Sequence, residues 1–174
     1  MSVYKSKAKP DETLDAVFSG RISFTQAIEE KKKNPSTSIL GTTGIDEASK
    51  LRPSASEVAE LGPDFEFLYN RDFRDQIDRP LLLIPVVNGF LGDASKLPPG
   101  QYITFGWYTT YPYSRGSVYI TSQDVEAEPD FNGGYFASDF DVKACVWGYK
   151  KQREIARRLK TFDGPVLELS LIHI

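Results

Sequence analysis

The stretch ITFGWYTTYPYSRGSVYITS, from Ile103 to Ser122, crowds aromatic and β-branched residues onto two runs separated by a Tyr-Pro-Tyr-Ser-Arg-Gly corner. These residue types suit the pleated, half-buried surface of a sheet, so the stretch predicts a hairpin: a strand, a sharp turn and a second strand. Side chains alternate between the two faces of a strand. Phe105 and Trp107 therefore fall on one face and Tyr108 on the other. Because both faces carry an aromatic ring, we expect both to be covered.

Helices are expected before this hairpin. Residues 11–34 have a helical pattern, with a reciprocal capping box at Ser23 to Gln26. A second capping box at Ser54 to Glu57 opens a short helix through Leu61, and an apolar stripe at helical spacing continues to about Ile77. Residues 35–53 are rich in Ser, Thr, Gly and Pro and predict an irregular connection.

The segments on either side of the hairpin are predicted to form a strand before it and a loop and a long helix after it. The apolar run from Leu81 to Leu91 contains Pro85 and Gly89, which favours a bulged or edge strand over a central one. Residues 123–134 are polar and acidic and predict a loop. The longest helix is expected from about Asp139 to Lys160. Its apolar face is predicted to comprise Val142, Cys145, Val146, Tyr149, Ala156 and Leu159, and its basic residues are expected to be solvated.

Composition excludes several functional classes. The formal net charge of −3 gives no electrostatic reason to expect nucleic acid as a partner, and no apolar stretch approaches the length of a membrane span. Cys145 is the only cysteine and His173 the only histidine, which argues against a disulfide framework, a metal centre or a Ser-His-Asp triad. The amino end has no apolar core of the kind that a secretory signal requires.

An ordered series of segments resembles one protein family. The series runs from the Tyr-Pro-Tyr-Ser-Arg-Gly corner and the Ile-Thr-Ser strand, through Tyr135-Phe136, to the helix segment Trp-Gly-Tyr-Lys-Lys-Gln-Arg-Glu-Ile-Ala-Arg-Arg at 147–158. It is similar to the glucose–methanol–choline (GMC) oxidoreductases, which use FAD, and most similar to their fungal methanol (alcohol) oxidase group. Residues 41–53 and 90–101 also resemble that group, so the resemblance extends from about Asp11 to Val166.

The resemblance implies an α+β fold in which helices flank an antiparallel sheet, as in the substrate-binding half of the family. It divides the chain into a helical lead-in (1–34), a partial substrate-binding domain (35–166) and a non-native tail (167–174). It also implies that a short primary alcohol is oxidised to an aldehyde, with FAD as cofactor, oxygen as acceptor, peroxide as product and a homo-oligomer as the full-length assembly. The family's Gly-x-Gly-x-x-Gly fingerprint is absent, and its catalytic histidine is expected outside this chain, so we assign no catalytic residue here.

Tyr108 is the one candidate site residue. In related oxidases an aromatic residue four positions before the corner proline faces the substrate, and Tyr108 holds that position here. An aromatic wall would hold a short alcohol by burial and exclude water. The alternative is a sheet residue packed beneath a helix. Arg115 and Gly116 are predicted to be structural, the arginine pairing with a carboxylate and the glycine adopting a positive φ.

Two other functional classes stay open at this point. The aromatic sheet would suit a carbohydrate-binding module, in which Trp107 stacks on sugars. A truncated, non-functional product would instead expose the apolar surface that normally meets the flavin domain. The resemblance leaves the compartment open among peroxisome, cytoplasm and secretion.

Overall fold

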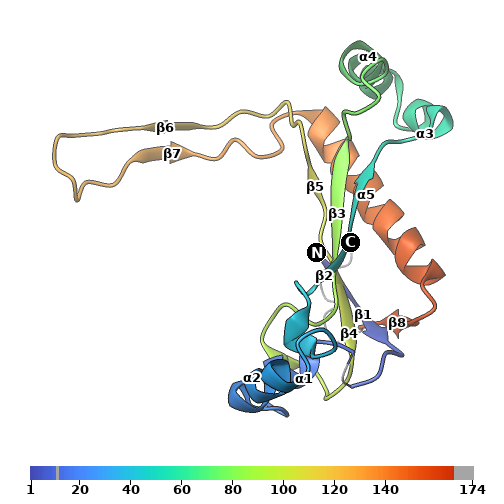
Figure 1. The fold of residues 1–174 in the computed structure, drawn as a ribbon. Helices are drawn as coiled ribbons and strands as arrows, with labels where there is room; N and C mark the ends of the chain where they lie inside the picture. The colour runs from blue at the N-terminus through green and yellow to red at the C-terminus, as the bar shows by residue number, and fades with distance from the viewer. Residues whose placement is uncertain (11, 167–174) are drawn as a thin grey trace. The chain divides into compact units, whose positions relative to one another are not determined.

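The computed structural model describes residues 1–10 and 12–166, and its α+β architecture confirms the fold class predicted from the sequence (Figure 1). The helices are α1 (Asp15–Phe18), α2 (Phe24–Lys33), α3 (Ala55–Glu60), α4 (Pro63–Asp72) and α5 (Asp139–Arg158), with 3-10 turns at Ile39–Gly41 and Ala94–Lys96. The strands are β1 (Ser2–Ser6), β2 (Ile45–Leu51), β3 (Leu82–Val87), β4 (Tyr102–Phe105), β5 (Tyr108–Thr109), β6 (Ser117–Tyr119), β7 (Asp130–Asn132) and β8 (Phe162–Pro165).

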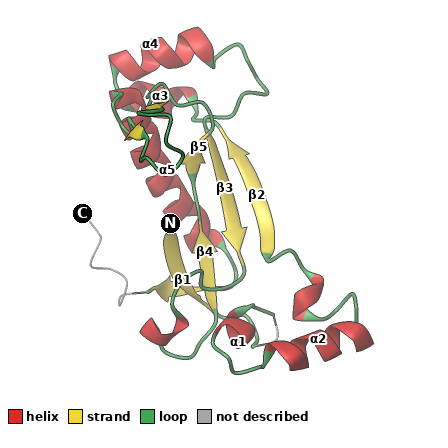
Figure 2. Ribbon diagram, turned by 90° about the vertical axis from the view of Figure 1, so that its left-hand side faces the viewer, coloured by secondary structure: helices red, strands yellow, loops and turns green. Residues whose placement is uncertain are grey.

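Six strands form one sheet in the order β2-β3-β4-β1-β8, with β5 also pairing β3; Figure 2 shows strands β1 to β5 of this sheet. β6 and β7 form a separate ribbon (Figure 1). The predicted pairing of the two runs across the corner is therefore wrong. β5 pairs β3, whereas β6 pairs β7, which lies in the segment predicted to be a loop. The corner does not close a hairpin because the backbone N–H groups of Tyr113 and Ser114 donate to the carboxylate of Asp141.

The position of β3 also differs from the prediction. β3 has neighbours on both sides, so it is not an edge strand. Pro85 lies between the residues that pair β5 (Leu82 and Leu83) and those that pair β4 (Val86 and Val87). Its carbonyl still accepts a hydrogen bond from the N–H of Gly106 at 3.0 Å. Proline lacks an N–H, so its presence removes one ladder hydrogen bond, and the sheet tolerates that loss where the partner strand is interrupted.

Within the described residues the chain divides into two compact units. Unit 1 comprises Met1–Ser49, Ile84–Trp107 and the described residues from Lys150 onward, and unit 2 comprises Lys50–Leu83 and Tyr108–Tyr149. The domain limits predicted at residues 34 and 166 stay predictions. The proposed non-native tail, 167–174, lies outside the described residues, as does His173.

Unit 1 contains a strand that the sequence analysis misses. Ser2–Ser6, placed in a helical lead-in by the prediction, form β1, which pairs β4 and β8 in antiparallel fashion. Alternate residues of β1 are buried, and the hydroxyl of Tyr4 donates to Oε1 of buried Gln152 at 3.1 Å. The two helices of the lead-in, α1 and α2, are present, and the capping box at Ser23 and Gln26 is confirmed.

A buried carboxylate organises the loops of unit 1. Asp15, at the start of α1, accepts hydrogen bonds of 2.8 Å from the backbone N–H groups of Phe90 and Tyr102. Both donors lie more than 70 residues from Asp15 in the sequence, so one side chain satisfies two buried backbone donors of other segments. The rings of Phe90 and Tyr102 then pack with Leu97 and Val166 in a small apolar cluster.

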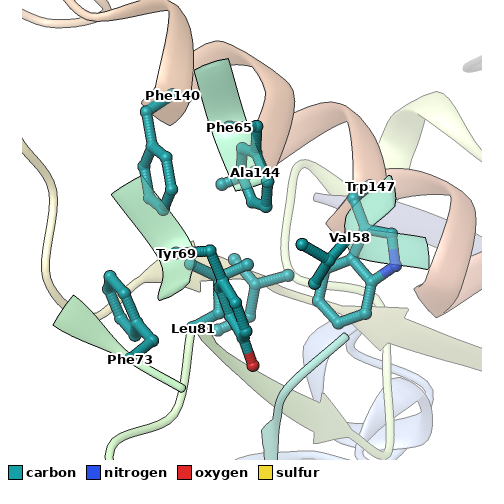
Figure 3. Packing of buried hydrophobic residues seen from close by; sticks show 9 residues of the cluster. Val58, Phe65, Tyr69, Phe73, Leu81, Phe140, Ala144 and Trp147 are labelled. Carbon is teal, nitrogen blue, oxygen red and sulfur yellow. The ribbon is translucent and has the colours of Figure 1, made fainter. Parts of the chain in front are cut away.

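Unit 2 holds the larger apolar core, in which α4 packs against α5 (Figure 3). Phe65 of α4 stacks on Phe140 of α5 with ring centroids 4.3 Å apart, and Tyr69 stacks on Phe73 at 5.6 Å. α3 contributes Val58 to the same cluster, and its capping box at Ser54 and Glu57 is confirmed. Each fully buried side chain of this size stabilises the fold by about 1.5–3 kcal/mol relative to exposure.

The long helix is confirmed, but its predicted apolar face is wrong in unit 2, whereas Ala156, in unit 1, is buried as predicted. α5 runs from Asp139 to Arg158, close to the expected limits. In unit 2 its buried apolar side chains are Phe140, Ala144 and Trp147, whereas Val142 and Val146 are exposed. In unit 2 the buried apolar face is therefore shifted by about half a turn from the predicted one, and it carries the large aromatic side chains of Phe140 and Trp147. A strand, β2, also forms in residues 35–53, where every residue from Ile45 to Ala48 is exposed and so leaves no hydrophobic pattern to detect.

Candidate functional site

The candidate site residue Tyr108 begins β5, the two-residue strand at the start of the corner. Its backbone partner is Leu83 of β3, and its side chain is 52% exposed. The ring therefore lies partly on the surface of unit 2. Within the described residues, the ring of Tyr108 is therefore not packed beneath a helix, which was the structural alternative. Trp107, on the preceding position, is partly buried.

The corner that follows Tyr108 is held by hydrogen bonds from three directions. The N–H of Thr110 donates to the carbonyl of Leu81 at 3.2 Å, and its hydroxyl donates to the carbonyl of Pro80 at 2.5 Å. Asp141, buried in the first turn of α5, accepts from the N–H groups of Tyr113 at 2.9 Å and Ser114 at 2.7 Å. The path of the chain from β5 to the corner is thus fixed at both ends.

A charged cluster lies beside the corner. Asp72 accepts two hydrogen bonds from Arg71, at 3.0 and 2.6 Å, and one from the hydroxyl of Tyr113. The hydrogen bonds from Arg71 and then Tyr113 lower the pKa of Asp72 to about 2. Burial, followed by the hydrogen bond to Asp72, raises the pKa of Tyr113. At neutral pH this arrangement is an ionised carboxylate between a guanidinium and a neutral phenol, which suits positioning rather than proton transfer.

A cation lies between two aromatic rings in the same unit. The guanidinium of Arg79 lies 4.5 Å from the ring centroid of Phe73 and 4.3 Å from that of Tyr111. Its Nη1 donates to the carbonyl of Asp72 at 2.9 Å. Arg79 and Tyr111 line a surface cavity of about 550 Å³ together with residues 75–78. Sequence reasoning missed Arg79, and missed Asp141 as the corner's anchor, because Tyr111 lies 32 residues from Arg79, and Tyr113 and Ser114 lie 28 and 27 residues from Asp141.

Arg115 and Gly116 have structural roles that differ from those predicted. Nη1 of Arg115 donates to the carbonyls of Pro112 and Ser114, so its partners are backbone oxygens rather than a carboxylate. Gly116 does not have a positive φ. A glycine is required there for another reason: a Cβ at this position would lie 2.4 Å from the carbonyl oxygen of Asn132. The backbone of the next segment simply comes too close.

The Cys145 thiol and the acidic side chains of the described residues do not form a nucleophilic or metal-binding site. Cys145 is partly buried rather than in the core, and burial followed by the charge of Asp141 raises the pKa of its thiol, so the thiol form prevails at neutral pH. Among residues 1–10 and 12–166, no three His, Cys, Asp or Glu side chains gather in a way that would hold a metal ion. None of the helices in that part of the chain combines the length and the apolarity needed to cross a bilayer.

Among the described helices, the starts of α2, α3, α4 and α5 do not fit the pyrophosphate of a dinucleotide. Such a group needs free N–H groups at a glycine-rich helix start. The Ser23 and Ser54 hydroxyls already accept from the first turns of α2 and α3. The first turns of α4 and α5 each carry two acidic residues, Asp64 with Glu66 and Asp139 with Asp141, which would repel phosphate.

The comparisons with known proteins agree on one family. Residues 112–170 match the family model described as GMC oxidoreductase. Alcohol oxidase 1 of Komagataella phaffii is 37% identical over 161 residues, which is 92% of this chain and 24% of that protein. The alcohol oxidase of Candida boidinii is 37% identical over 88% of this chain and 23% of its own length. The alcohol oxidase of Pichia angusta is 41% identical over 73% of this chain and 19% of its own length.

The chain spans about a quarter of the length of these relatives or less. The matching family model begins at Pro112, so it covers the end of the corner, the β6–β7 ribbon and the whole of α5. The same segments carry the ordered motifs that suggested the resemblance. The GMC oxidoreductases are FAD-dependent as a family. The chain belongs to the GMC oxidoreductase family, with fungal alcohol oxidases among its relatives.

Proposed function

We propose that this chain is part of an FAD-dependent alcohol oxidase and contributes to the wall of its alcohol-binding cavity. The overall reaction would convert a short primary alcohol and O₂ to an aldehyde and hydrogen peroxide. The observation that carries the proposal is the 36–41% identity to alcohol oxidases, which in the Komagataella protein extends over 92% of this chain. The chain would supply binding surface, while the residues that hold the flavin and transfer the proton would lie in other parts of the full-length enzyme.

Tyr108 is the residue we propose to face the alcohol. Its ring is half-exposed, and its backbone is fixed through Leu83 and the anchored corner, so the ring is presented on a stable support. A half-exposed ring is what such a wall needs, because the remainder of its surface would be covered by the substrate and by the rest of the enzyme. Burial of one or two alcohol carbons against the ring would contribute about 0.8 kcal/mol per methylene.

No observation favours the carbohydrate-binding alternative. Sugar stacking needs an open aromatic face, and Trp107 is partly buried and makes interactions within the protein. The other alternative, a truncated and non-functional product, is a statement about the isolated chain and not about the gene that encodes the full-length protein. It predicts that residues 1–174 aggregate when they are produced on their own.

The decisive experiment is to purify the protein encoded by the complete reading frame. We expect a yellow protein with flavin absorbance, which releases peroxide when methanol or another short primary alcohol is added. A secondary alcohol of similar size is the matched control and should give much less peroxide. A colourless protein, or a flavoprotein that releases no peroxide with any primary alcohol, would refute the proposal.

A further inference from the structure

Leu83 is the direct cross-strand neighbour of Tyr108. Both residues belong to unit 2, where the first residues of β3 pair with β5 in antiparallel fashion and Leu83 lies opposite Tyr108 (Figure 2). The N–H of Thr110 donates to the carbonyl of Leu81 at 3.2 Å, which continues the same register beyond the two paired residues of β5. A slip of one residue would move Tyr108 to the other face of the sheet, so this register decides which side chain lies beside its ring.

Leu83 and Tyr108 share one face of the sheet. In an antiparallel pair, residues directly opposite each other point to the same face, with their Cβ atoms about 4.5–5.5 Å apart. The adjacent pair, Leu82 and Thr109, points to the opposite face because side chains alternate along a strand. The ring of Tyr108 therefore has a leucine side chain as its neighbour across the strands.

The two faces differ in their burial. Leu82 is 0% exposed and belongs to the apolar core of unit 2. Leu83 is partly buried, and among the described residues that core does not include it. Any molecule or segment that covers the ring of Tyr108 in the full-length protein must also lie against Leu83, because the two side chains are neighbours. This conclusion depends on the register and not on the exposure of either side chain.

The backbone that carries this pair is held on both sides of Tyr108. Leu83 lies within β3, and beyond β5 the hydroxyl of Thr110 donates to the carbonyl of Pro80 at 2.5 Å. The corner that follows is held by the carboxylate of Asp141. Side chains on strands hold a binding geometry more precisely than side chains on loops. Leu83 and Tyr108 therefore present a surface of fixed spacing.

We propose that Leu83 is a second residue of the alcohol-binding wall and that it determines which alcohols the enzyme accepts. This inference rests on the proposed function, in which Tyr108 faces the alcohol. Leucine offers an aliphatic surface without a hydrogen-bonding group. The carbon chain of an alcohol would be buried against it, whereas a second hydroxyl group there would lose its water without gaining a partner from Leu83. The substrate class is therefore short primary alcohols with a single hydroxyl group.

The size of the side chain at position 83 tests the contact in two directions. In the full-length enzyme, Leu83→Ala should raise the ratio of kcat/KM for n-butanol to kcat/KM for methanol by about three- to tenfold, because it opens space beside the substrate. Leu83→Phe fills that space and should lower the same ratio. A merely structural role of Leu83 would reduce activity in both variants without moving the ratio in opposite directions.

Thr109→Ala is the matched control for these variants. Thr109 follows Tyr108 directly on β5 and is also partly buried, but it points to the opposite face with Leu82. The variant should therefore leave the ratio for n-butanol and methanol unchanged. An equal change of the ratio in Thr109→Ala and Leu83→Ala would overturn the inference, as would an unchanged ratio in both variants of Leu83.

A matched pair of substrates tests the polarity of the wall. n-Propanol and ethylene glycol are close in size and differ in having a terminal methyl or a second hydroxyl group. Wild type should prefer n-propanol, and Leu83→Asn should reduce this preference in kcat/KM by at least about tenfold, because the amide can bond to the second hydroxyl. Thr109→Asn should leave the preference as it is.

The outcomes of these experiments separate this inference from the proposed function. A preference for n-propanol that stays unchanged in Leu83→Asn would refute the role of Leu83, while peroxide release by the wild-type enzyme would leave the proposed function standing. A wild-type enzyme that releases no peroxide with any primary alcohol would refute the proposed function, and the inference about Leu83 with it.

Discussion

The corner depends on one buried carboxylate. Both oxygens of Asp141 accept backbone N–H groups, from Tyr113 and Ser114, and the residue is 3% exposed. In Asp141→Asn an amide NH₂ replaces one acceptor and opposes a backbone donor. We expect a loss of about 1–3 kcal/mol in the free energy of unfolding, measured by urea denaturation. Asp139→Asn, exposed in the same helix turn, is the control and should cost less than about 1 kcal/mol. Equal losses in the two variants would contradict this role.

The Asp72 cluster predicts a dependence of stability on pH. The pKa of Asp72 is lowered from 3.8 to about 2, chiefly by Arg71 and then by Tyr113. A group with a lowered folded-state pKa stabilises the protein above its unfolded pKa, and this contribution is lost as pH falls through the folded value. The difference in melting temperature between wild type and Asp72→Asn should therefore be constant above about pH 4 and shrink towards pH 2. A difference that does not change with pH would show that Asp72 is not coupled to Arg71 and Tyr113.

At the scale of the element, the packing of α5 gives the clearest prediction. Phe140 is 3% exposed and stacks on Phe65, whereas Val142, two residues later, is exposed. Phe140→Ala should lower the free energy of unfolding by about 3–5 kcal/mol, because it leaves a cavity in the aromatic cluster. Val142→Ala is the control and should cost less than about 0.5 kcal/mol. Chemical denaturation of both variants measures the two values. A larger loss for Val142→Ala would favour the helix face predicted from the sequence.

Short-range sequence patterns predicted the helices and their capping boxes better than they predicted which strands pair. Both capping boxes and the limits of α5 follow from residues within one or two helix turns of each other, so the sequence was sufficient for them. Strand pairing depends on distant segments. Nothing near the corner indicates that Asp141 captures its donors, which is why the hairpin was mispredicted. β2 was missed because an exposed strand has no apolar alternation, and β1 because its partners lie about 100 and 160 residues away.

At the scale of the whole molecule, family membership was easier to predict than the site. The order of motifs from the corner to α5 is read directly from the sequence. A wrong prediction of strand pairing therefore does not change the family assignment. The site is harder, since under the proposed function the cavity wall would be completed by segments outside the quarter of the relatives' length that this chain spans. Tyr108 was chosen by its position before Pro112, and its exposed ring is compatible with that choice but does not test it.

The size of the alcohol accepted provides that test. In the full-length enzyme, Tyr108→Ala should raise KM for methanol by about three- to tenfold, because burial of the alcohol carbon against the ring is lost. The same change opens space beside the substrate, so kcat/KM for longer primary alcohols should fall less or rise. Tyr108→Phe keeps the ring and should retain the preference for short alcohols, which separates wall packing from a role of the hydroxyl. Phe67→Ala controls for loss of an exposed ring elsewhere. Unchanged chain-length preference in Tyr108→Ala would remove Tyr108 from the alcohol site.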